Sequence, residues 1–222
     1  MRTVLLMRCG VSFGPHFLVP VHHIVNTVQD ADLVLGTCSL NEAIRRDHVK
    51  IGVPKEIKVA EYRVAMTPSG AAQLVADGHS VSVESGAGVG SGFTDNDYLI
   101  AGARVSAGAD AVWADADLIL KVKEPLEVEY PYLEQRGADL TLFTYLHLSG
   151  VTGLAAVLCR TGTTAVAYET VETESGEFPL LAPMSDIAGQ LAVHAVSTYL
   201  RRPLGTRGML ISGVAGVPPA KI

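Results

Sequence analysis

Three ionisable side chains follow or end predicted strands. Lys123 ends the apolar run in LKVKEP, His147 ends LFTYLH, and Arg63 lies in a polar loop after the first predicted strand. The carboxyl ends of strands in an open α/β sheet usually face a ligand. There a guanidinium can hold a carboxylate, an ammonium can polarise a carbonyl oxygen, and an imidazole can transfer protons near neutral pH. These residue types indicate binding of a small carboxylate or carbonyl compound, with proton transfer.

Each of these residues also has a purely structural interpretation. Arg63 can be a solvated arginine, and His147 can be hydrogen-bonded to a neighbouring carbonyl. By strand alternation Lys121 and Lys123 share a face, so either one of them is accommodated differently or both extend to solvent. Ser185 precedes a long helical pattern, where it can cap the helix or help the helix start to receive an anion or a nicotinamide amide. The residues alone leave these alternatives open.

The glycine-rich stretch GAGVGSG at 86–92 has the setting of a phosphate-binding loop but not its spacing. A G-x-G-x-x-G motif would need glycine at 91 or 93, where the chain has Ser91 and Phe93. No basic residue lies nearby to meet a phosphate. We therefore interpret this stretch as a tight structural loop.

The elements that must position these groups alternate regularly from Lys50 onward. Short β-type runs alternate with amphipathic helical stretches, which predicts an α/β fold with a Rossmann-like parallel sheet flanked by helices. Residues 1–48 lack this alternation and are predicted to be an appendage. The expected strands are 50–53, 79–84, 116–122, 140–146 and 163–168, and the expected helices are 67–78, 95–102, 150–160 and 185–202.

Composition narrows the class of protein. The 222 residues are 48% hydrophobic and carry a formal net charge of −6 without any long basic run, so nucleic acid is not an expected partner. No uninterrupted run of about 18 apolar residues predicts a membrane-spanning helix. Cys9, Cys38 and Cys159 have no metal-ligand spacing, so neither a zinc site nor a disulfide framework is expected. A reducing cytoplasm fits this cysteine content best.

A series of motifs, in order along the chain, resembles the amino-terminal half of alanine dehydrogenase, a family related to the nucleotide-binding subunit of proton-translocating transhydrogenase. The resemblance runs from Val49 to Ile222. KVKEP, FTYLH and LAPMS favour the dehydrogenase branch. The motifs are IGVPKEIK (51–58), RVAMTP (63–68), ESGAG (84–88), VWADADLILKVKEP (112–125), LFTYLH (142–147), AYETV (167–171), LLAPMSDIAGQLA (180–192) and GVPPAKI (216–222).

The resemblance implies a function and roles for individual residues. It implies NAD-dependent, reversible oxidative deamination of L-alanine to pyruvate and ammonium by a cytoplasmic homo-oligomer without a metal. Arg63 and Lys123 would bind the carboxylate and carbonyl of pyruvate. His147 would be the acid and base, and Ser185 would contact NAD.

The resemblance also divides the chain into parts. We expect an extension at 1–48 that precedes the true start, a substrate domain at 49–184, and a connecting helix with the start of the NAD-binding domain at 185–222. The main NAD-binding motif would lie beyond Ile222, so we expect a truncated chain without catalysis of its own. The alternatives are a standalone binding module, with or without a separate cofactor chain, and a transhydrogenase-type nucleotide subunit.

Overall fold

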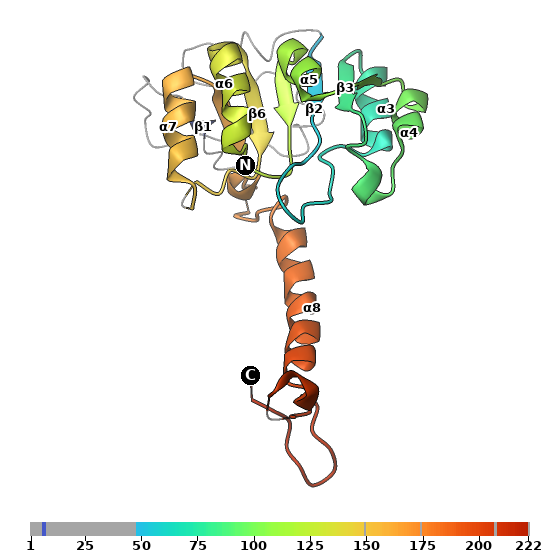
Figure 1. Ribbon diagram of the computed structural model, residues 1–222, viewed down its shortest axis with the longest axis vertical. Coiled ribbons are helices and arrows are strands. Elements are labelled where there is room, and N and C mark those ends of the chain that lie inside the picture. The colour runs from blue at the N-terminus through green and yellow to red at the C-terminus, as the bar shows by residue number, and fades with distance from the viewer. Residues whose placement is uncertain (1–5, 8–47, 149, 174, 207, 222) are drawn as a thin grey trace. The chain divides into compact units, whose positions relative to one another are not determined.

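The structure is a computed structural model that describes residues 6–7, 48–148, 150–173, 175–206 and 208–221. It divides into two compact units, Met1–Phe178 and Pro179–Ile222 (Figure 1). The proposed appendage at 1–48 lies outside the described residues, apart from residues 6, 7 and 48. The predicted division at 184/185 stays a prediction.

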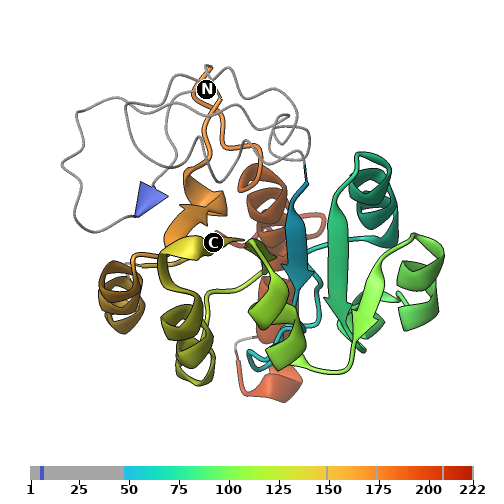
Figure 2. The same ribbon diagram turned by 90° about the horizontal axis from the view of Figure 1, so that it is seen from above.

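The strands of the described residues form one seven-stranded sheet in the order β1-β7-β6-β5-β2-β3-β4 (Figure 2). Neighbouring strands from β2 to β7 pair in parallel, and β1 pairs antiparallel with β7 at the edge. The predicted Rossmann-like parallel sheet is thus confirmed. The strands are β1 (Leu6–Met7), β2 (Lys50–Val53), β3 (Ser80–Glu84), β4 (Arg104–Ser106), β5 (Leu118–Leu120), β6 (Thr141–Thr144) and β7 (Thr164–Ala167).

The strand order reverses direction between β2 and β5. From β2 the chain adds β3 and β4 on one side, and it then returns to add β5, β6 and β7 on the other. The register of the central pair places Ile51 beside Leu118 and Gly52 beside Ile119. In doubly wound sheets, ligands bind outside the carboxyl ends of the strands at such a reversal. The topology therefore marks the carboxyl ends of β2 and β5 as the candidate site.

Helices flank this sheet. α3 packs with α4, whereas α5 packs with α6 and α6 with α7. Threonines cap two of these helices: the Thr67 hydroxyl accepts from the Gly70 amide at 3.1 Å, and Thr94 forms a capping box with Asp97. The α-helices are α3 (Pro68–Ala76), α4 (Asp95–Ile100), α5 (Ala109–Asp115), α6 (Tyr130–Arg136), α7 (Thr152–Thr161) and α8 (Ala182–Tyr199). The short 3-10 helices are η1 (Val89–Ser91), η2 (Glu127–Glu129), η3 (Gly137–Asp139), η4 (Tyr168–Thr170) and η5 (Arg202–Leu204).

One apolar cluster holds α5, α6 and α7 against β5, β6 and β7. Trp113 of α5 is almost fully buried and stacks on Tyr132 of α6, with ring centroids 5.3 Å apart. Burial of such aromatic side chains contributes on the order of 2–3 kcal/mol each. The core fixes the strands whose carboxyl ends carry the site. Its other buried members include Val112, Ile119, Leu133, Leu142, Leu154, Leu158 and Ala165.

Several elements differ from their sequence predictions. β4, α5 and α6 are not predicted at all, because each is short. The expected strand at 116–122 is shortened to β5, although Lys121 still donates its amide to the Phe143 carbonyl at 3.1 Å.

α8 begins at Ala182 with Pro183 in its first turn, so Ser185 is inside the helix instead of capping it. The capping role predicted for Ser185 is wrong.

The glycine-rich stretch at 86–92 is a tight loop, as predicted. A Cβ at Gly88 would meet Tyr98 Cε2 at 2.7 Å, and a Cβ at Gly90 would overlap the carbonyl oxygen of Tyr62. Gly92 has φ 82°, a left-handed conformation that glycine adopts at no steric cost. Gly88 and Gly90 are thus required by packing within the chain, and Gly92 by its backbone conformation.

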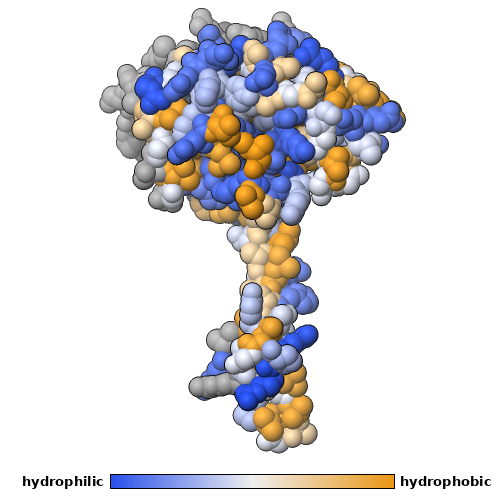
Figure 3. All heavy atoms as spheres, in the orientation of Figure 1, coloured by the Kyte–Doolittle hydropathy of each residue, from blue (hydrophilic) through white to orange (hydrophobic). Residues whose placement is uncertain are grey.

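The second unit contains α8, η5 and an isolated bridge between Val214 and Val217. Apolar side chains lie at its surface along α8 and beyond, as Figure 3 shows. Among the described residues, no helix is both long and apolar enough to cross a membrane. The exposed large apolar residues of α8 are Met184, Ile187, Leu191, Val193 and Tyr199.

Gly52 allows α5 to pack directly on β2. A Cβ at this position would lie 2.7 Å from Ile119 Cδ1 and 2.9 Å from Val112 Cγ1, closer than real side chains approach. We expect Gly52→Ala to lower the free energy of unfolding by about 1–3 kcal/mol through overpacking. Urea denaturation followed by circular dichroism measures this loss.

Gly153→Ala is the matched control, because a Cβ at Gly153 in α7 meets nothing within 4 Å. There alanine should leave stability unchanged or raise it by about 0.5–1 kcal/mol. Equal effects at the two positions would contradict the packing explanation.

Candidate functional site

The structure brings three of the predicted site residues to one edge of the sheet. Arg63 lies in the loop after β2, Lys123 follows β5, and His147 follows β6. β2 and β5 are the two strands at the reversal of strand order, and β6 is the next neighbour of β5. Parallel strands present their carboxyl ends at one edge, so residues distant in sequence meet there.

Arg63 is oriented by a carboxylate from its own loop. Its Nε donates to Glu61 Oε1 at 2.8 Å and its second terminal nitrogen donates to Glu61 Oε2 at 2.5 Å, a bidentate pair. This hydrogen bonding, with the charges of Arg63 and Lys123, holds the pKa of Glu61 below its usual range. Lys123 is therefore close enough to act on the same carboxylate as Arg63.

A buried carboxylate, Glu56, fixes the backbone around Lys123. Glu56 Oε1 accepts from the amides of Val122 and Lys123 at 2.6 and 3.2 Å. Its other oxygen lies 3.3 Å from the Lys121 ammonium, which also donates to Glu129 at 2.8 Å. Burial raises the pKa of Glu56, although Lys121 and the two amides oppose this change.

Lys121 and Lys123 have different environments, as one of the sequence alternatives required. The side chain of Lys121 is 1% exposed and is neutralised by Glu56 and Glu129, whereas Lys123 is only half-buried. Since β5 ends at Leu120, strict alternation does not extend to these residues. Lys121 is thus a structural residue, and Lys123 is the lysine available to the site.

Glu124 lies between Lys58 and His147. Glu124 is 3% exposed, and its Oε2 lies 3.3 Å from His147 Nδ1. Its Oε1 accepts from the ammonium of Lys58. Burial alone would raise the pKa of Glu124, but hydrogen bonds and the charge of Lys58 hold it below its ordinary value. A carboxylate at this distance orients the imidazole when Nδ1 carries a proton, and it leaves the other ring nitrogen for chemistry.

His147 is accessible. Its side chain is 47% exposed, and its ring centroid lies 5.9 Å from that of Tyr145. Its backbone is left-handed, with φ 47°. The imidazole can therefore exchange protons with a ligand at the edge of the sheet.

Ser185 belongs to the second unit and is described separately. It is an exposed residue of the first turn of α8, and its hydroxyl donates to the Leu181 carbonyl at 3.4 Å. The contact with NAD predicted for it stays a prediction. In the described part of the chain, no cluster of three or more histidine, cysteine, aspartate or glutamate side chains could hold a metal ion.

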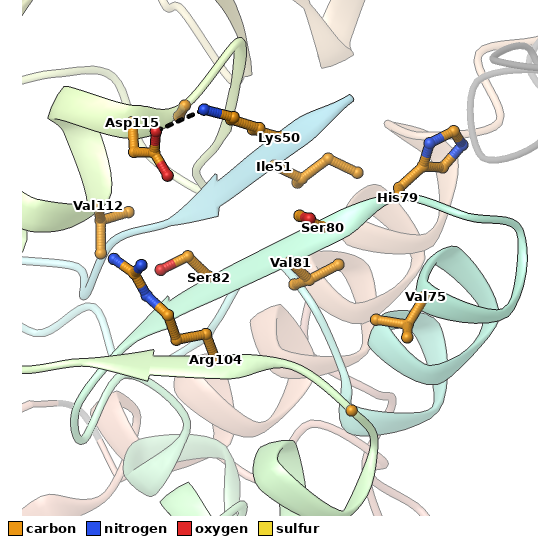
Figure 4. Close-up of a pocket in the computed structure, with 12 residues that line it drawn as sticks. Lys50, Ile51, Val75, His79, Ser80, Val81, Ser82, Arg104, Val112 and Asp115 are labelled. Carbon is orange, nitrogen blue, oxygen red and sulfur yellow. Dashed lines mark hydrogen bonds and ion pairs between the residues drawn. The ribbon is translucent and has the colours of Figure 1, made fainter. Parts of the chain in front are cut away.

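A separate pocket of about 320 Å³ lies at the other end of the strands (Figure 4). Its lining includes the first residues of β2, β3 and β4, namely Lys50, Ser80 and Arg104. The Lys50 ammonium pairs there with Asp115 at 2.7 Å. Because Arg63, Lys123 and His147 follow the carboxyl ends of their strands, this pocket does not belong to the candidate site.

Comparison with known proteins identifies the family. Residues 52–188 match the family model described as alanine dehydrogenase/PNT, N-terminal domain. The chain belongs to this family. It is 49% identical over 172 residues to alanine dehydrogenase of Mycolicibacterium smegmatis and 50% identical over 172 residues to that of Bacillus subtilis. These alignments cover 78% of this chain and 46% and 44% of the two relatives, so the chain spans about half their length.

Solved structures give the same assignment. An L-alanine dehydrogenase superposes with a TM-score of 0.69 at 48% identity, over 77% of this chain and 46% of that chain. A transhydrogenase from Sinorhizobium meliloti gives a TM-score of 0.49 at 32% identity over 54% of this chain and 33% of that chain. The superposition on L-alanine dehydrogenase shows that the chain has the fold of the alanine dehydrogenase N-terminal domain.

The family motifs contain carboxylates that sequence reasoning missed. Glu56 in IGVPKEIK and Glu124 in KVKEP resemble surface residues in sequence, yet both are buried beside the predicted site residues. One signal was available: each carboxylate lies within a few residues of a predicted strand end. Their partners are distant in sequence, so only the folded chain shows what they bind.

The buried Lys121 ammonium should contribute strongly to the stability of this domain. We expect Lys121→Met to lower the free energy of unfolding by about 3–5 kcal/mol, because Glu56 and Glu129 would be left buried without their cation. Urea denaturation measures the loss. Lys50→Met is the control, since that lysine pairs with Asp115 at the surface and should cost less than about 1 kcal/mol. Similar losses for both variants would contradict this account.

Glu124 should contribute to acid stability. Because its folded-state pKa is depressed, its stabilisation is present above its unfolded pKa and is lost as pH falls through the folded value. Removing the Lys58 ammonium raises the folded pKa of Glu124. We therefore expect Lys58→Met to move the acid-unfolding midpoint to higher pH and to cost about 1–2 kcal/mol at neutral pH. A pH titration followed by circular dichroism tests this.

Lys55→Met is the matched control for Lys58→Met, since the Lys55 side chain is exposed in the same loop. It should change stability by less than about 0.5 kcal/mol. If the two variants unfold at the same pH, Lys58 does not set the pKa of Glu124.

Proposed function

We propose that this chain supplies the substrate-handling half of an alanine dehydrogenase. The reaction is the reversible, NAD-dependent oxidative deamination of L-alanine to pyruvate and ammonium. One observation carries this proposal: Arg63, Lys123 and His147 follow the carboxyl ends of β2, β5 and β6, at and beside the reversal of strand order. Glu61 pairs with the Arg63 side chain, Glu56 accepts the Lys123 amide, and Glu124 lies beside the His147 ring. The similarity to alanine dehydrogenases supports it.

The proposed substrate contacts follow from the chemistry of the three side chains. The Arg63 guanidinium presents a planar set of donors that suits a carboxylate, and Glu61 holds its plane. The Lys123 ammonium polarises the carbonyl oxygen of pyruvate. Fixing both ends of so small a molecule sets the orientation of its reactive carbon.

His147 supplies proton transfer. Formation of a carbinolamine from pyruvate and ammonia, and its breakdown, require protons to move between nitrogen and oxygen substituents of one carbon. With Nδ1 beside Glu124, the ring presents its other nitrogen to the substrate. In the reverse direction the same nitrogen takes up the proton of the attacking water.

NAD serves as the hydride acceptor in this proposal, but the described residues do not form its pyrophosphate site. The glycine-rich loop at 86–92 is filled by the chain's own Tyr62 and Tyr98. We therefore assign only substrate binding and proton transfer to these residues, with a contact from Ser185 to the nicotinamide as a further part of the proposal. A cytoplasmic homo-oligomer is proposed on the family resemblance.

Pyruvate binding to the purified chain tests the proposal. Titration of ¹³C-labelled pyruvate, followed by NMR, should give a dissociation constant that Arg63→Met and Lys123→Met each raise about tenfold or more, as expected for loss of a charge-assisted hydrogen bond. Propionate lacks the carbonyl oxygen. Lys123→Met should therefore weaken the binding of pyruvate more than the binding of propionate. Arg63→Met should weaken the binding of both compounds equally.

Lys55→Met serves again as the control, because it removes an exposed lysine from the same loop as Arg63. Its affinity for pyruvate should equal that of the unaltered chain. Saturable binding that survives both Arg63→Met and Lys123→Met would contradict the proposed site.

A further inference from the structure

The backbone of His147 has a conformation that a side chain usually avoids. Among the described residues, His147 and Ala60 are the non-glycine residues with positive φ, at 47° and 63°. A left-handed residue with a Cβ is disfavoured by contact between that Cβ and the backbone. Such residues persist only where their surroundings hold them, and they cluster at functional sites. Contacts with neighbouring groups must therefore hold the His147 backbone in this conformation.

The Glu169 carboxylate, from the segment that follows the neighbouring strand, accepts hydrogen bonds from the amides of Leu146 and His147. Glu169 Oε1 accepts from the His147 amide at 2.8 Å and from the Leu146 amide at 3.1 Å, and Oε2 lies 3.2 Å from the Leu146 amide. Glu169 belongs to η4, which directly follows β7, and β7 pairs with β6. Hydrogen bonds from two successive amides to an ionised carboxylate are stronger than those between neutral groups.

The remaining contacts complete the turn. The Leu146 side chain is fully buried, and the His147 carbonyl accepts from the Gly150 amide at 2.9 Å. In this conformation His147 Nδ1 lies 3.3 Å from Glu124 Oε2. One carboxylate thus binds the peptide of His147, while a second faces its ring.

We propose that Glu169 is a positioning residue for His147. By accepting the amides of Leu146 and His147, it holds His147 in the left-handed conformation that presents the ring to Glu124 and to the substrate. The inference rests on the proposed function of His147, but the conformation itself can be measured without substrate. Glu169 has no direct contact with substrate in this role.

NMR of the full, isotopically labelled chain tests the proposal. The three-bond coupling between the amide and α protons reports φ of His147, and the ring ¹⁵N shifts report its contact with Glu124. In Glu169→Ala we expect the coupling to move to the extended range and the ring shifts to change. The glutamine variant retains one oxygen acceptor, so Glu169→Gln should keep both values closer to those of the unaltered chain.

Glu172→Ala is the matched control. It removes a half-buried carboxylate three residues further on that has no hydrogen bond to either amide in the described contacts, and it should leave the His147 signals unchanged. Coupling and ring shifts that stay unchanged in Glu169→Ala overturn the proposal. If Glu169→Ala fails to fold, Glu169→Met decides, because it keeps the length of the side chain without the carboxylate: a shift of both values supports the role, and unchanged values overturn it.

The outcomes separate this inference from the proposed function. Loss of left-handed φ in Glu169→Ala, together with an unaltered chain that does not bind pyruvate, would keep the positioning role and refute the function. Pyruvate binding in the unaltered chain, together with unchanged φ in Glu169→Ala, would do the reverse. Where both hold, pyruvate affinity should fall several-fold in Glu169→Ala through misplacement of the ring.

Discussion

The rest of the site depends on the ion pairs that the buried Lys121 ammonium forms with Glu56 and Glu129. An isolated charge in the interior is very unfavourable, so Lys121 can be buried only because Glu56 and Glu129 lie at 3.3 and 2.8 Å. Glu56 comes from the loop after β2, and Glu129 belongs to η2 after β5. The ion pairs therefore join the two segments that leave the sheet where its strand order reverses, and Glu56 also fixes the amide of Lys123.

Hydrophobic periodicity predicted most of the sheet and missed specific parts. β2 matches its prediction at Lys50–Val53, because its apolar residues are bounded by polar ones. The prediction for β5 extends too far, since apolar residues continue past Leu120 although the strand ends there. β4 and α5 have few residues in which a period can be seen, so their existence follows from the topology rather than from local sequence. Tertiary packing therefore determines whether these elements form and where they end.

The same distinction applies to the candidate site. Lys123 and His147 could be selected as candidates because each ends an apolar run, and the carboxyl ends of parallel strands usually face a ligand. Glu124 and Glu169 could not, because a glutamate in a loop is ordinary until the fold brings His147 beside it. The roles of these glutamates arise from contacts with residues that are distant in the sequence. Sequence therefore indicates the ionisable groups at the strand ends more readily than the carboxylates that contact them.

Charge compensation explains how this edge of the sheet stays folded while presenting cations. Carboxylates lie beside two of the groups that face the site: Glu61 pairs with Arg63, and Glu124 lies beside the His147 ring. The carboxylates in turn are held by other donors, such as Lys58 on Glu124. A group restrained in this way does not need to be ordered when a ligand arrives, so less conformational entropy is lost on binding. The acidic residues of the site thus serve to preorganise its basic ones.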